Sequence, residues 1–173
     1  MRALIALSGE PVDEDLAAAA ARVLDPARDQ IIALHVISPG ETHSTYARIE
    51  ATDTAARYAD PAAQTLDRPL RAPAEGSEQA VERLHAAFEG HVSGLASRFL
   101  DGFSVDIQVR IADDPADAIL AVADELDVQG IGIGARTGQS RVGAALLGSA
   151  AAEVMRRAQV PVLVVKQGTI ANG

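Results

Sequence analysis

The fold is decided by residues 129–166, which read "QGIGIGARTGQSRVGAALLGSAAAEVMRRAQVPVLVVK". This stretch opens with the apolar strand "QGIGIG" and passes through a glycine-rich loop into the helix "SAAAEVMRRAQ". That helix carries two arginines near its C-terminus, where cations are favourable. The stretch closes with the apolar strand "VPVLVVK" at 160–166. Strand, helix and strand in this order predict a βαβ unit, in which the two strands are parallel.

The same alternation extends back to the N-terminus. Further strands are expected at 3–7, 30–40 and 104–111, and further helices at 11–25, 81–99 and 113–127. The run "ALIAL" at 3–7 lacks a period of two, as is typical of a parallel strand buried on both faces. By contrast, "SVDIQVRI" at 104–111 alternates, which places it nearer a sheet edge. The sequence therefore predicts an α/β fold, an open parallel sheet with helices on both faces.

One segment does not fit the alternation. Between residues 40 and 80 the prolines at 61, 69 and 73 interrupt the pattern, and no apolar period persists. We interpret 40–80 as an insertion that is mobile or forms a partial lid. The chain is then one domain, 1–168, followed by a disordered tail at 169–173.

Composition and charge exclude several classes of function. The 173 residues carry a formal net charge of −9 and no clustered basic face, so binding to nucleic acid is not expected. The absence of cysteine excludes disulfides, thiolate metal sites and cysteine nucleophiles. The sequence shows neither a signal peptide nor an apolar run that spans a bilayer, so we expect a cytoplasmic protein without a membrane segment.

The glycine-rich loop is a candidate site for an anion. Gly148 and Ser149 begin the helix after the loop, where unpaired backbone N–H groups and a partial positive charge favour phosphate. The Ser149 hydroxyl can either cap the helix or donate to a phosphate oxygen. Such a loop is also a common structural connection, and neither the Walker pattern nor the dinucleotide fingerprint stands in the required strand context.

The stretch from Asp113 to Lys166 resembles the C-terminal half of the universal stress protein family. The family pattern runs from a D-P-x-x-A-I helix through a strand to G-x-x-G-x(9)-G-[ST], a helix and a P-V-L-V-V strand. In this chain nine residues separate Gly138 from Gly148, which Ser149 follows. The segment "LHVISP" is similar to the second strand of that family.

The resemblance implies a Rossmann-like sheet of order 3-2-1-4-5, which reverses direction between the first and fourth strands. Ligands of open α/β sheets bind outside the strand ends at such a point. By resemblance, the ligand is ATP, with or without Mg²⁺. Ser8 would bind the nucleoside, Val36 would pack against adenine, and the glycines would face the phosphates. The full set of expected binding residues is Ser8, Gly9, Val36, Ile133, Gly134, Gly138, Gly148 and Ser149.

Two departures from the family pattern keep a second function open. Ser8 stands where ATP-binding members commonly have aspartate, and three residues rather than two separate Gly134 from Gly138. The chain is therefore either an ATP-binding regulatory protein of the stress response or a dimeric interaction module that binds no nucleotide.

Enzyme activity beyond very weak ATP hydrolysis is not expected. The segment "LSGEPVDED" is faintly similar to the S-G-G-x-D-S phosphate loop of ATP pyrophosphatases, but Glu10 replaces a needed glycine. Ser8, Ser140 and Ser149 have no evident histidine base. No metal site is expected, because Asp114 is explained as a helix cap and His85 and His91 lack a ligand spacing.

The last strand predicts self-association. "PVLVV" is an apolar strand expected at the sheet edge, where unpaired backbone groups favour pairing with a second copy. The resemblance implies the same homodimer.

Overall fold

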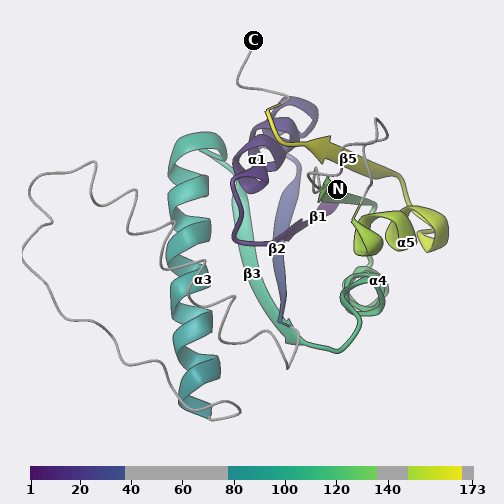
Figure 1. Ribbon diagram of the computed structural model, residues 1–173. Coiled ribbons are helices and arrows are strands. Elements are labelled where there is room, and N and C mark those ends of the chain that lie inside the picture. Colours follow the sequence, from purple (N-terminus) through teal and green to yellow (C-terminus); the bar gives the residue numbers. More distant parts are fainter. Residues whose placement is uncertain (38–77, 136–147, 169–173) are drawn as a thin grey trace, which may run out of the picture.

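The computed structural model describes residues 1–37, 78–135 and 148–168, and these form one parallel sheet flanked by helices (Figure 1). The strands are β1 (Arg2–Leu7), β2 (Gln30–Ile37), β3 (Ser104–Ile111), β4 (Gly130–Ala135) and β5 (Val162–Lys166). The helices are α1 (Val12–Val23), α3 (Glu78–Phe99), α4 (Pro115–Glu125) and α5 (Ser149–Arg157).

The strand order is β3-β2-β1-β4-β5, and every neighbouring pair is parallel. The predicted α/β fold and order 3-2-1-4-5 are thus confirmed. β3, whose sequence alternates, lies at one edge of the sheet, and β5 lies at the other. The order reverses between β1 and β4, so a crevice opens at the carboxyl ends of these two strands.

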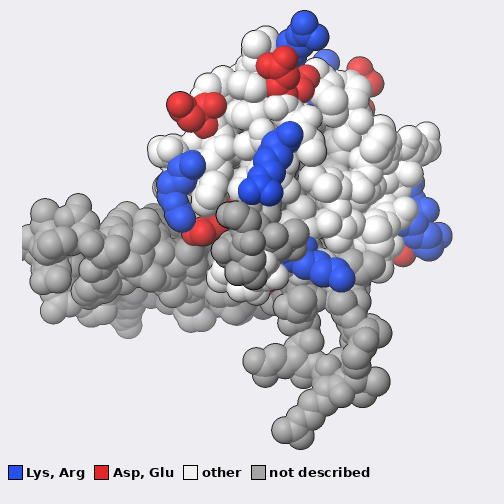
Figure 2. Space-filling view, turned by 90° about the horizontal axis from the view of Figure 1, so that it is seen from above, with Lys and Arg blue, Asp and Glu red and all other residues white. Residues whose placement is uncertain are grey.

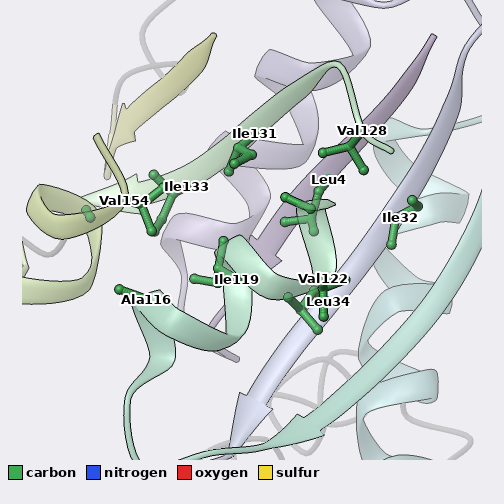
Figure 3. Packing of buried hydrophobic residues seen from close by; sticks show 12 residues of the cluster. Leu4, Ile32, Leu34, Ala116, Ile119, Val122, Val128, Ile131, Ile133 and Val154 are labelled. Carbon is green, nitrogen blue, oxygen red and sulfur yellow. The ribbon is translucent and has the colours of Figure 1, made fainter. Parts of the chain in front are cut away.

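Each central strand sends alternate side chains to opposite faces of the sheet, and both faces are covered. Leu4 and Ile32 pack with α4 and α5, where the contact includes Ile119 and Val154 (Figure 3). Ile5 packs on the other face with α1 and α3, in a cluster that includes Leu16. Burial on both sides is the reason that residues 3–7 of β1 are all apolar.

The two helix starts nearest the crevice differ in how they are capped. Asp114 caps α4, since its carboxylate accepts hydrogen bonds from the backbone N–H groups of Ala116 and Asp117, and Pro115 is the first helical residue, as predicted. Gly148 is the N-cap of α5 and has no side-chain cap. Ser149 is the first helical residue of α5 and not its cap.

The structure describes only the last residues of the predicted insertion at about 40–80. α3 begins at Glu78, so residues 78–80, the last of the predicted insertion, are helical. The prediction of a mobile lid concerns 40–77, and these residues lie outside the described part of the chain, as does the expected tail at 169–173.

Candidate functional site

A crevice lies at the carboxyl ends of β1, β2 and β4, beside the start of α5. Its walls are apolar on the side of β2 and β4 and polar at the turn between β1 and α1. The lining residues are Ala6, Leu7, Ser8, Glu10, Val12, Leu34, His35, Val36, Pro115, Ile119, Ile133, Gly134, Gly148, Ala150 and Ala151. The crevice therefore combines apolar walls with a few polar groups, as is typical of small-molecule sites.

The structure brings most of the predicted binding residues to this crevice. The lining includes Ser8, Val36, Ile133, Gly134 and Gly148. These residues come from β2, β4, the β1–α1 turn and the start of α5, so the topology alone gathers them.

The remaining predicted residues have other positions. Gly9 is buried beside the crevice with φ of 74°, a backbone conformation that favours glycine. Ser149 is exposed and borders a neighbouring hollow together with Asp113 and Asp114. Gly138 lies outside the described residues.

The β1–α1 turn is organised by Asp13, a residue that the sequence analysis does not single out. Its carboxylate accepts hydrogen bonds from the backbone N–H of Ser8 at 3.1 Å and of Gly9 at 2.7 Å. The Ser8 hydroxyl also donates to Asp13 Oδ1 over 3.2 Å. These amides are therefore occupied within the turn, while the Ser8 oxygen keeps acceptor capacity toward the crevice.

Two histidines support the same turn from neighbouring elements. His35 lies within β2 and its Nδ1 is 2.9 Å from the carbonyl oxygen of Leu7, so Nδ1 carries the hydrogen and donates. The Nε2 of His91 on α3 lies 3.0 Å from Asp13 Oδ2. The Phe88 ring lies between the two histidines, stacked on His35 with ring centroids 4.8 Å apart and tilted against His91 at 6.4 Å.

This arrangement is not that of a serine nucleophile with a histidine base. The Asp13 carboxylate lies between Ser8 and His91, since it binds the Ser8 hydroxyl through Oδ1 and the histidine through Oδ2. A base that activates serine must itself be within hydrogen-bond reach of the hydroxyl. The geometry therefore gives no support to nucleophilic catalysis at Ser8.

Gly134 has a packing role that does not depend on a ligand. A Cβ at this position would lie 2.8 Å from Cγ1 and 3.0 Å from Cγ2 of Val12 on α1. The same strand contains Gly132, where a Cβ would lie 3.1 Å from Leu16 Cδ1. Gly132 and Gly134 thus let α1 approach β4 closely.

We expect Gly134→Ala to lower the free energy of unfolding by about 1–3 kcal/mol, because Val12 must move to admit the methyl group. Gly94→Ala on α3 is the matched control, since nothing lies within 4 Å of its added Cβ. Alanine is favoured over glycine in a helix, so the control should gain about 0.5–1 kcal/mol. Urea denaturation of both variants would measure the difference, and a Gly134→Ala protein as stable as the native one would contradict the packing explanation.

The start of α5 is the helix N-terminus at which the sequence predicts an anion. Gly148 has φ of −52° and ψ of 151°, and its carbonyl accepts from the N–H of Ala152 at 3.0 Å. The N–H groups of the first helical turn have no partner within the helix. These donors and the helix dipole favour a negative group at the crevice.

In the hollow beside Ser149, Asp114 and Glu153 already have polar partners. Asp114 is used as the cap of α4, and a hydrogen bond from Arg156 lowers the pKa of the Glu153 carboxyl. Among the described residues, no group of three or more His, Asp or Glu side chains is placed to hold a metal ion.

Charge on the surface is mixed in sign. Figure 2 shows one face of the molecule, on which Lys and Arg side chains stand apart with Asp and Glu among them. No continuous basic band crosses the described residues of that face.

Comparison with known proteins identifies the family. The universal stress protein family matches residues 1–166, and the chain belongs to this family. No curated protein matches the chain significantly.

Within residues 1–37, 78–135 and 148–168, no helix is both long enough and apolar enough to cross a bilayer.

Solved structures of the family share the fold. A universal stress protein from Archaeoglobus fulgidus has a TM-score of 0.62 at 18% identity, with 96% of this chain and 98% of that chain covered. The protein from Archaeoglobus fulgidus in complex with dAMP has a TM-score of 0.58 at 17% identity, with the same coverage. A universal stress protein in complex with cAMP has a TM-score of 0.53 at 18% identity, covering 96% of this chain and 97% of that chain.

Proposed function

We propose that this protein binds an adenine nucleotide, ATP with or without Mg²⁺, in the crevice between β1 and β4. It would act as a cytoplasmic regulatory protein of the stress response, with at most very weak ATP hydrolysis. The observation that carries the proposal is the convergence of the sheet reversal, the start of α5 and an apolar wall at one crevice. The dAMP and cAMP complexes of structurally similar family members support the choice of an adenine nucleotide.

The crevice residues suit the parts of such a ligand. Val36 and Ile133 supply apolar contact for a base, and the acceptor of Ser8 suits a ribose hydroxyl. Gly148 brings the first-turn N–H groups of α5 toward the phosphates. In this proposal the phosphate oxygens supply most of the Mg²⁺ ligands, since Mg²⁺ commonly binds through substrate phosphates and water.

A dimeric interaction module without nucleotide is the second candidate. It is favoured by one observation, that the amides of Ser8 and Gly9 are already bound to Asp13. Equilibrium titration of the purified, nucleotide-free protein with labelled ATP separates the two functions. Saturable binding supports the nucleotide proposal, and no binding supports the interaction module.

We also propose that the protein forms a homodimer through β5, an edge strand whose Leu163 is 38% exposed. Leu163→Asp is expected to shift the protein toward monomer in sedimentation experiments, because a carboxylate would be buried at the interface. Val164 is a poorer probe, since it packs against the core.

Ile111→Asp is the matched control for this variant. Ile111 is 53% exposed on β3, the opposite edge of the sheet, so the change should leave association unaltered. A native protein that is monomeric at micromolar concentration, or equal effects of both variants, would contradict the β5 interface.

A further inference from the structure

We propose that Asp13 and His91 are positioning residues of the crevice, which hold the β1–α1 turn in the shape that presents Ser8 to the ligand. This inference rests on the proposed nucleotide function. It adds α3, an element that does not line the crevice, to the parts of the protein that determine ligand affinity.

The Asp13 carboxylate is buried and accepts several hydrogen bonds. Its side chain is 1% exposed, and it accepts from four donors, the backbone N–H groups of Ser8 and Gly9, the Ser8 hydroxyl and the His91 ring. Three of these donors belong to two consecutive residues of the turn. A buried carboxylate is stable only when donors surround it, so the turn and Asp13 fix each other.

His91 is the donor that reaches Asp13 from outside the turn. Its side chain is 8% exposed, and its Nε2 lies 3.0 Å from Asp13 Oδ2. Since the carboxylate accepts, Nε2 carries a hydrogen in this contact. The contact joins residues 78 positions apart and links α3, through Asp13 of α1, to the turn that follows β1.

The position of His91 is fixed by the core beneath it. Phe88 lies one turn earlier on α3, is fully buried, and stacks on His35 of β2. His35 in turn donates to the carbonyl of Leu7, the last residue of β1. The end of β1 is therefore held at its carbonyl by β2 and at the next two amides through Asp13 and α3.

The Ser8 side chain depends on this support for its direction. Its hydroxyl hydrogen is directed to Asp13 Oδ1, which leaves its lone pairs to accept from a ligand in the crevice. Without His91, Asp13 keeps the turn donors but loses the only one of its four donors that reaches it from another element, a hydrogen bond to the Oδ2 that the Gly9 amide also binds. We expect the turn to open more often and Ser8 to present its acceptor less often.

The test compares three variants of the full chain. His91→Leu removes the donor, and His91→Gln keeps an N–H group that can reach a carboxylate. Arg98→Leu is the matched control, because Arg98 lies on α3 and binds Glu14 of α1 at 2.7 Å and 3.2 Å without touching the turn. The first readout is amide hydrogen exchange at Ser8 and Gly9, and the second is the Kd for ATP, both measured where each variant is fully folded.

In His91→Leu, exchange at the Gly9 amide should speed up by about tenfold and the Kd for ATP should rise about fivefold or more. His91→Gln should bring the exchange rate at Gly9 and the Kd for ATP most of the way back to their native values. Arg98→Leu should change neither quantity. A general loss of stability would not raise the Kd of the folded protein, so the two readouts separate positioning from a purely structural role.

Unchanged exchange in His91→Leu would overturn the inference, as would faster exchange with an unchanged Kd. Equal effects of His91→Leu and Arg98→Leu would overturn it as well. If the native protein bound no ATP, the proposed function would fail, and the exchange data alone would then decide whether His91 holds the turn.

Discussion

Asp13→Ala is expected to lower the free energy of unfolding by about 3 kcal/mol. The substitution leaves the N–H groups of Ser8 and Gly9 and the His91 ring without their common acceptor. The Gly9 contact is buried and those of Ser8 and His91 are partly buried, so the substitution leaves polar groups unsatisfied and costs more than the loss of a surface ion pair.

Glu14→Ala is the control for Asp13→Ala. Glu14 is the next residue along α1 and pairs with Arg98, but its side chain is 45% exposed. Exposed ion pairs contribute little, so this variant should lose less than about 1 kcal/mol. Urea denaturation of both variants measures the comparison, and equal losses would show that Asp13 does not organise the turn.

Gly148→Val is expected to raise the Kd for ATP more than tenfold, or by about 1.4 kcal/mol of binding free energy. Gly148 lines the crevice at the start of α5, and a branched side chain there would keep phosphate from the first-turn N–H groups. Its φ of −52° and ψ of 151° are accessible to valine, so backbone strain does not explain the loss.

Ala152→Val is the control for Gly148→Val. Ala152 is exposed on the same helix, one turn further along, and does not line the crevice. Calorimetric titration with ATP should give a native Kd for this variant. A Gly148→Val protein that binds ATP as well as the native protein would show that the start of α5 does not hold the phosphates.

Most of the fold follows from local patterns in the sequence. The uninterrupted apolar run of β1 and the alternation of β3 reflect central and edge positions, and the structure confirms both. Asp114 and Pro115 mark the start of α4, because a cap and a proline have local physical causes. The start of α3 at Glu78 was missed, since the apolar stripe used to find it becomes regular only later in the helix.

The site could be predicted only in part. The crevice and its glycines follow from topology, since the carboxyl ends of neighbouring parallel strands meet at one edge of the sheet. Asp13 could not be distinguished from Glu14 and Asp15, because an acidic residue in the first turn of a helix is explained by the helix dipole alone. The signal available in the sequence is Gly9 itself, since a glycine directly after a strand marks a turn, and the amides of that turn need an acceptor nearby.

His35 and His91 were missed because their roles depend on tertiary contacts. His35 stands in an apolar strand, where a polar residue needs a buried partner, and that partner is the Leu7 carbonyl 28 residues earlier. Gly134 shows the opposite problem, in which a residue predicted for ligand contact also has a packing role against Val12. Spacing in the sequence does not distinguish a glycine needed for packing from one needed for contact with a ligand.

A crystal structure of the native protein grown with saturating ATP tests the central claim most directly. The proposal predicts the nucleotide between the carboxyl ends of β1 and β4, with its phosphates at the N–H groups that follow Gly148 and its base against Val36 and Ile133. Nucleotide bound elsewhere on the protein, or a crevice that stays empty at saturating ATP, would contradict the claim.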